Sequence, residues 1–128
     1  MKENCHVLVV DDDNTIAEML KTGLEIIGYS VTVAMSETEI WDSLKQKLPD
    51  VILMDVGMPG IDGISLCRTL RFSKDYADVP IVMVTAFSDN RTFHDAMFFG
   101  ASGFLTKPFD MGDVQKKIEE VLEKNTVR

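Results

Sequence analysis

Residues 7–13 read VLVVDDD, so that four apolar residues run directly into three aspartates. Residues 51–55 repeat this pattern as VILMD, which closes on the single carboxylate of Asp55 before a glycine-rich turn. Short apolar runs closed by turn residues are typical of strands buried on both faces of a parallel sheet. Such strands deliver their last residues to one edge of the sheet, where α/β proteins bind ligands. Carboxylates from both runs would repel one another there, which predicts a hard cation such as Mg²⁺ among them.

The composition is that of an ordinary soluble globular domain. The chain has 128 residues, 45% hydrophobic and 27% charged, which is enough for one domain with a sizeable core. Its 13 basic and 21 acidic residues give a net charge of −8, which disfavours nucleic acid or an anionic membrane as a direct partner. The apolar runs are far shorter than the roughly 20 residues of a membrane span, and no signal peptide fits before the first strand. We therefore expect a cytoplasmic protein, with Cys5 and Cys67 buried and reduced.

Strand and helix patterns alternate five times along the chain without a linker. Strands are expected at residues 5–10, 30–34, 50–55, 81–84 and 102–105. Helices are expected from 14 to 28, from 36, after the glycine-rich turn, from 88 or 89 to 100, and from about 110. This alternation predicts an α/β fold, a doubly wound five-stranded parallel sheet in a flavodoxin-like three-layer sandwich. Right-handed crossovers leave few topologies, and the order 2-1-3-4-5 places the three most apolar strands in the middle. We expect one domain spanning residues 1–128.

Local signals predict helix boundaries and buried faces. Asp13 is expected to cap the first helix, and Ser36 with Glu39 is expected to form a capping box for the second. The expected core residues of the first two helices are Ile16, Met19, Leu20, Leu24 and Ile27, then Ile40, Trp41, Leu44 and Leu48. Those of the third and last helices are Leu66, Cys67 and Leu70, then Val114, Ile118, Val121 and Leu122.

Four strand ends are expected to converge on the same edge of the sheet. Asp11 to Asp13 follow the first strand, Asp55 ends the third, Thr85 the fourth, and Lys107 comes after the fifth. Each residue alone is compatible with a structural role, as a cap, a strand end or part of a loop. Together they predict a metal and phosphate site, in which the carboxylates hold Mg²⁺, Lys107 neutralises phosphoryl oxygens and Thr85 donates a hydrogen bond.

On these residues the chain resembles the receiver domains of two-component response regulators, including single-domain chemotaxis-type regulators. The resemblance covers essentially the whole chain. It rests on four motifs in family order and spacing: VLVVDDD at 7–13, DVGMPGIDG at 55–63, VTA at 84–86 and GFLTKPF at 103–109.

The resemblance implies a role for each residue of the site. Asp55 would be the phosphoacceptor, with Asp12 a direct Mg²⁺ ligand, Asp11 its water-mediated neighbour and the Gly57 carbonyl a further ligand. Thr85 would be the switch hydroxyl, Phe104 the switch aromatic and Lys107 the phosphate-binding lysine, followed by a cis bond to Pro108. The implied phosphodonor is a histidine kinase or a histidine phosphotransfer protein. The domain would catalyse only its own phosphorylation and dephosphorylation and is otherwise not an enzyme.

Two departures from the family pattern affect the expected behaviour. Many relatives have tyrosine at the position of Phe104, so rotation of this ring would be sensed through shape and apolarity alone. Gly57 and Phe87 occupy positions that tune phosphoryl hydrolysis in the family, and neither side chain can orient a water, which predicts a long-lived phosphorylated state. Phe98 is a candidate exposed aromatic beside Phe104, with burial against a neighbouring element as the alternative.

Two other functions remain open at this point. Asp11 and Asp13 also fit the Asp-x-Asp-x-Thr signature of haloacid-dehalogenase-type phosphatases, although the chain is short for that fold and lacks its later acidic motif. The chain could also be a receiver relative that acts only as an interaction module, without phosphorylation. The sequence leaves open the cognate kinase, the output and whether the protein is a free-standing regulator or part of a longer one. It also leaves open a monomer or a phosphorylation-dependent dimer.

Overall fold

The computed structural model describes residues 5–56, 63–85 and 100–127. Its strands are β1 (His6–Val10), β2 (Ser30–Ala34), β3 (Val51–Asp55), β4 (Ile81–Thr85) and β5 (Gly103–Thr106). Its helices are α1 (Asn14–Ile27), α2 (Glu37–Gln46), α3 (Gly63–Arg71) and α5 (Met111–Val127). The helix expected between residues 88 and 100 lies outside the described residues.

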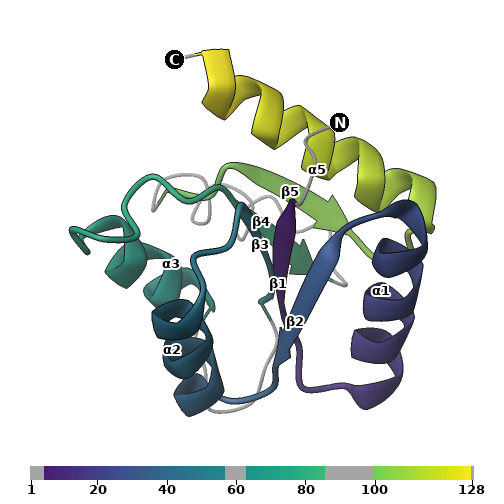
Figure 1. Cartoon of the computed structure of the whole chain (residues 1–128), viewed down its shortest axis with the longest axis horizontal. Coiled ribbons are helices and arrows are strands. Elements are labelled where there is room, and N and C mark those ends of the chain that lie inside the picture. Colours follow the sequence, from purple (N-terminus) through teal and green to yellow (C-terminus); the bar gives the residue numbers. More distant parts are fainter. Residues whose placement is uncertain (1–4, 57–62, 86–99, 128) are drawn as a thin grey trace.

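The five strands form one parallel sheet in the order β2-β1-β3-β4-β5, as predicted. Figure 1 shows α2 and α3 on one face of this sheet and α1 and α5 on the other. The carboxyl ends of all five strands therefore open on the same edge. This arrangement confirms the doubly wound three-layer fold.

The core is divided by the sheet into two apolar layers, because successive side chains of a strand point to opposite faces. Leu8, Ile52 and Met83 face the layer under α2 and α3. Val9, Leu53 and Val82 face the layer under α1 and α5. All six are at most 1% exposed, as expected of central strands covered on both faces.

Both helix caps are largely as predicted. The Asp13 carboxylate accepts hydrogen bonds from the backbone N–H groups of Thr15 and Ile16, and so caps α1. Ser36 Oγ accepts from Glu39 N at 3.2 Å, which caps α2. The reciprocal bond of the capping box differs by one residue. The Glu39 carboxylate accepts from Met35 N instead of from Ser36 N.

Two predicted core residues are exposed. Met19 is 45% exposed because α1 buries a narrow stripe centred on Ala17, Leu20 and Leu24, and Met19 lies roughly 130° around the helix from the centre of that stripe. Leu48 is 56% exposed because α2 ends at Gln46, and the chain leaves it in extended conformation at Lys47. Leu48 is therefore not on the buried face of the helix.

The remaining core predictions agree with the structure. Cys5 and Cys67 are buried and form no disulfide, and Trp41 packs with its ring centroid 6.2 Å from that of Tyr76. In the described part of the chain, no helix combines the length and the apolar composition that a membrane span requires.

Candidate functional site

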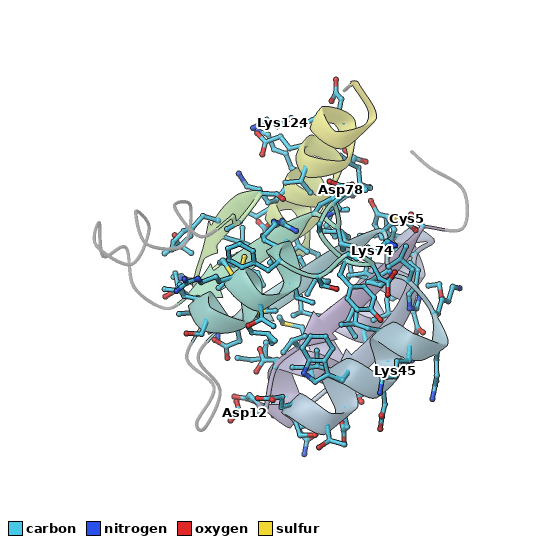
Figure 2. All side chains as sticks on the ribbon, turned by 90° about the vertical axis from the view of Figure 1, so that its left-hand side faces the viewer. Cys5, Asp12, Lys45, Lys74, Asp78 and Lys124 are labelled. Atoms are coloured by element: carbon cyan, nitrogen blue, oxygen red, sulfur yellow. The ribbon has the colours of Figure 1, made fainter. Side chains whose placement is uncertain are left out.

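An acidic cluster forms where β1 and β3 end. The two strands are paired, with Val10 beside Met54, so Asp11 and Asp55 follow at adjacent positions of the same edge. Single carboxylate oxygens of Asp11, Asp12 and Asp55 all lie within 4.8 Å of one another. Figure 2 shows Asp12 at the opposite end of the β1 segment from Cys5, which precedes the strand. The expected convergence of these three acids is therefore present.

The three acids differ in their surroundings. Asp11 is buried, with 2% of its surface exposed, and Asp12 is exposed. The Asp55 side chain is 12% exposed. Burial raises the pKa of the Asp11 carboxyl, the Asp13 backbone N–H opposes this effect, and the negative charge of Asp55 adds to it. An ionised Asp11 thus lies in surroundings that disfavour its charge.

Lys107 is the basic residue of the site. It follows β5, and its Nζ lies 3.9 Å from Asp55 Oδ2. Its backbone N–H donates to the Thr85 carbonyl at 2.6 Å, which ties the end of β5 to the end of β4. The Lys107–Pro108 peptide bond is cis, as expected. The lysine is therefore held by the backbone beside the carboxylate predicted to accept phosphate.

Thr85 and Phe104 lie on the neighbouring strands of this edge. Thr85 is the last residue of β4 and is 4% exposed. Asp55 pairs with Val84, so Thr85 follows the residue directly beside Asp55. Phe104 is half-buried in β5 and packs against the core layer under α2 and α3. Thr85 therefore lies on the strand next to that of Asp55, and Phe104 lies one strand further out in the sheet.

Some predicted site residues cannot be compared with the structure. Gly57, Phe87 and Phe98 lie outside the described residues. Asp13 is not among the clustered acids, because its carboxylate caps α1. The structure therefore brings together Asp11, Asp12, Asp55 and Lys107, with Thr85 at the adjoining strand end.

One hydrogen bond of the site was not predicted from the sequence. The Asp13 backbone N–H donates to Asp11 Oδ1 at 2.9 Å. Aspartates commonly bond a backbone N–H two residues ahead of them, so the position of Asp11 at a strand end was the available signal. This bond fixes the orientation of the Asp11 carboxylate.

The donor set fits Mg²⁺. Clustered carboxylate oxygens are the ligands that this ion prefers. A divalent cation would also stabilise the ionised form of Asp11, against the burial and the charge of Asp55 that raise its pKa. Asp11, Asp12 and Asp55 are the described residues that could hold it.

Comparison with known proteins gives a consistent result. The family model described as response regulator receiver domain matches residues 7–119. Transcriptional regulatory protein CseB of Streptomyces coelicolor is 36% identical over 124 residues, covering 97% of this chain and 52% of CseB. The chain spans about half the length of the curated relatives it matches.

Two solved structures have the same fold over nearly the whole chain. Chemotaxis response regulator CheY4 of Vibrio cholerae matches with a TM-score of 0.86 and 30% identity, over 92% of this chain and 98% of that one. The signal receiver domain of a signal transduction histidine kinase from Syntrophus aciditrophicus matches with a TM-score of 0.84 and 33% identity. That match covers 94% of this chain and 91% of the other.

Proposed function

Because this chain belongs to the response regulator receiver domain family, we propose that residues 1–128 form one Mg²⁺-dependent phosphoacceptor switch, with Asp55 as the phosphoacceptor. The observation that carries the proposal is the position of Asp55, which lies in the cluster of three carboxylates and 3.9 Å from Lys107 Nζ. Carboxylates beside a lysine suit a reaction in which a carboxylate receives a phosphoryl group and the resulting charge must be neutralised.

Asp55 is better suited to attack phosphorus than Asp11. One oxygen of Asp11 accepts the Asp13 N–H, and Asp11 is 2% exposed. The Asp55 side chain is more accessible, at 12% exposed, and has Lys107 beside it. An oxygen of Asp55 attacks phosphorus in line, and the bond between phosphorus and the donor's leaving group breaks with its electron pair on that group.

Asp11 and Asp12 would hold the metal together with Asp55, and by resemblance to the family the Gly57 carbonyl would be a further ligand. Bound Mg²⁺ supplies charge neutralisation for the attacking and the transferred oxygens. Lys107, whose Nζ lies 3.9 Å from Asp55 Oδ2, adds a second positive group and binds a phosphoryl oxygen. The chain catalyses only its own phosphorylation and dephosphorylation.

Thr85 and Phe104 convert phosphorylation into a change of surface. A phosphoryl group on Asp55 provides an acceptor for the Thr85 hydroxyl, whose movement leaves space for the Phe104 ring. One charged hydrogen bond contributes about 1.5–3 kcal/mol, whereas shifting an equilibrium from 1:99 to 99:1 takes about 5.5 kcal/mol. Two such bonds, from Thr85 and Lys107, only just suffice, so the active conformation is partly populated before phosphorylation.

The partners follow from the family. The phosphodonor is a histidine kinase or a histidine phosphotransfer protein. The response is carried by the face made up of the helix expected between residues 88 and 100, β5 and α5, of which that helix lies outside the described residues. Some relatives are transcriptional regulators by name, and about half of their length lies outside the match. DNA binding in such proteins would therefore belong to other domains, and this domain acts as a monomer or a phosphorylation-dependent dimer.

The two alternative functions account for less of the site. A haloacid-dehalogenase-type phosphatase would use Asp13 as its acid/base, but the Asp13 carboxylate accepts two backbone N–H groups as the cap of α1. A module without phosphorylation would leave the cluster of acids and Lys107 without a purpose.

Phosphorylation by a small donor tests the proposal. Wild type incubated with acetyl phosphate should become phosphorylated with Mg²⁺ and stay unmodified with EDTA, as measured on phosphate-affinity gels. Asp55→Asn should stay unmodified in both conditions, and Asp42→Asn, an exposed acid of α2, is the matched control. Equal modification of Asp55→Asn and wild type would contradict the proposal.

A further inference from the structure

Arg71, the last residue of α3, joins two chain segments that are distant in sequence. Its Nη1 donates to the carbonyls of Val79 at 2.7 Å and Ala77 at 3.2 Å. Its Nε donates to the Gly100 carbonyl at 2.8 Å, and its Nη2 to Ser102 Oγ at 3.3 Å. One guanidinium thus fixes the residues that lead into β4 and those that lead into β5.

Ser102 extends this contact into the sheet. Its backbone N–H donates to the Ile81 carbonyl at 2.7 Å, and its Oγ accepts from Ile81 N at 3.1 Å. These bonds form the first rung of the β4–β5 ladder, which continues from the pair Val82 and Gly103 to the pair Thr85 and Thr106. Arg71 therefore holds the residue at which the register of β5 is set.

The position of β5 depends on this anchor because β5 is the shortest strand and lies at the edge of the sheet. An edge strand pairs on one side only, and a shift of one residue turns every side chain to the other face. Lys107 stands five residues beyond Ser102, roughly 16 Å along the strand. Asp78 lies close to Arg71, and Figure 2 shows Asp78 far from Asp12 of the acidic cluster.

Gly100 shows how closely this contact is built. Its φ is +103°, and a Cβ there would lie 2.6 Å from Arg71 Cγ and 2.9 Å from Arg71 Nε. Any side chain at this position would push against the guanidinium and its stem. The contact can therefore be perturbed from either partner.

We propose that Arg71 is a positioning residue for Lys107, because it anchors the start of β5 at Gly100 and Ser102 and so fixes where the strand delivers the lysine. The inference rests on the proposed function, in which Lys107 binds the phosphoryl group. Arg71 acts through the strand, at the end of the sheet opposite the acidic cluster.

The test uses beryllofluoride, a phosphoryl analogue. The affinity of the domain for beryllofluoride is measured by ¹⁹F NMR with saturating Mg²⁺. Arg71→Gln should weaken beryllofluoride binding about tenfold, as a misplaced charged hydrogen bond would. Affinity for Mg²⁺ alone should change by less than about twofold, because no metal ligand lies on β5. In a Lys107→Ala background, Arg71→Gln should cause no further loss.

Variants of the same contact keep the test decisive. Gly100→Ala should weaken beryllofluoride binding as Arg71→Gln does. Arg71→Lys should have an affinity for beryllofluoride between those of wild type and Arg71→Gln. If Arg71→Gln does not fold, Arg71→Lys is used in its place. Arg68→Gln removes the same charge from an exposed position of α3 and should bind as wild type. Beryllofluoride and Mg²⁺ affinities that fall together, or a full further loss in the Lys107→Ala background, would overturn the inference.

Failure of the proposed function gives a different result. If Lys107→Ala alone binds beryllofluoride as wild type does, the assigned role of Lys107 is wrong and the inference falls with it. If Lys107→Ala weakens binding and Arg71→Gln does not, the function of Lys107 stands and only the inference about Arg71 is overturned.

Discussion

His6 is a buried histidine at the start of β1, away from the acidic cluster. Its Nδ1 lies 2.9 Å from Ser30 Oγ and its Nε2 lies 3.0 Å from Thr32 Oγ1. Burial lowers its pKa below 6.5, the positive charge of Lys47 adds to this effect, and Asp50 partly opposes it. The folded state therefore favours the neutral ring.

The stability of the domain should consequently depend on pH through His6. Below about pH 6.5 His6 takes up a proton in the unfolded chain but not in the folded state. The free energy of unfolding therefore decreases as the pH is lowered from about 6.5 to the pKa of His6 in the folded state. Urea unfolding measures the free energy of unfolding at pH 7.5 and at pH 5.5. Its decrease between the two should be larger for wild type than for His6→Asn, which retains hydrogen-bonding groups. Equal losses for the two proteins would show that His6 does not contribute.

The phosphorylated state should be long-lived, as argued from the side chains at positions 57 and 87, both outside the described residues. Hydrolysis needs a water aligned with phosphorus, and neither glycine nor phenylalanine can orient it. Gly57→Asn or Phe87→Glu should supply a side chain that orients this water. Decay of phosphorylated Asp55 should then be about 10²-fold faster. The measurement is the loss of phosphoryl label from the isolated domain. Decay at the wild-type rate in both variants would show that these positions do not control water.

At the scale of the elements, the start of α1 separates two roles for the aspartates of residues 11–13. Asp13 caps the helix through Thr15 N and Ile16 N, whereas Asp11 and Asp12 belong to the acidic cluster. Stability and phosphorylation should therefore respond to different members of this run.

Asp13→Ala should lower the free energy of unfolding by about 1 kcal/mol, because it removes the cap of α1. Asp13→Asn retains a side-chain oxygen and should remain close to wild type. Both variants should be phosphorylated by acetyl phosphate as wild type is, once they are compared well below their melting temperatures. Loss of phosphorylation in a folded Asp13→Asn protein would return Asp13 to the reaction and favour the phosphatase alternative.

Most elements could be predicted from the sequence because continuous apolar runs for the strands, and apolar residues at helical spacing for the helices, were closed by clear turn residues. The strand order followed because the three most apolar strands must be covered on both faces. Boundaries moved by a residue or so: β4 ends at Thr85 and β5 begins at Gly103. The exposure of Met19 and Leu48 could not be predicted, since it depends on how each helix is rotated and where it ends.

The acidic cluster was predictable for the same reason as the fold, since parallel strands deliver their ends to one edge. The Asp11–Asp13 hydrogen bond and the contacts of Arg71 were not predicted. Arg71 gave no signal because its partners are backbone carbonyls and one hydroxyl, far apart in the sequence. Such contacts depend on tertiary structure and leave no local pattern.

At the scale of the whole molecule, we expect repulsion among the three clustered carboxylates to oppose folding when no cation is bound. Mg²⁺ should raise the free energy of unfolding, by about 2.7 kcal/mol when its free concentration is about 100 times its Kd. Asp12→Ala should lose most of this gain, yet melt no lower than wild type in EDTA, because it removes repulsion from the cluster.

Thermal melts with Mg²⁺ and with EDTA are the measurement, with Asp42→Ala as a matched control for removing an exposed acid. The control should keep the full response to Mg²⁺. A metal-free melting temperature clearly lowered by Asp12→Ala would mean that Asp12 is structurally paired, contrary to a repulsive metal cluster.

We propose that the whole fold serves to present one carboxylate, Asp55, to a phosphodonor. The most direct measurement is to phosphorylate the domain with acetyl phosphate and Mg²⁺, reduce the acyl phosphate with borohydride, and locate the modified residue by mass spectrometry. Modification should be found at Asp55 in wild type and should be absent from Asp55→Asn. Modification of Asp11, or of Asp55→Asn at the wild-type level, would contradict the assignment of Asp55 as the phosphoacceptor.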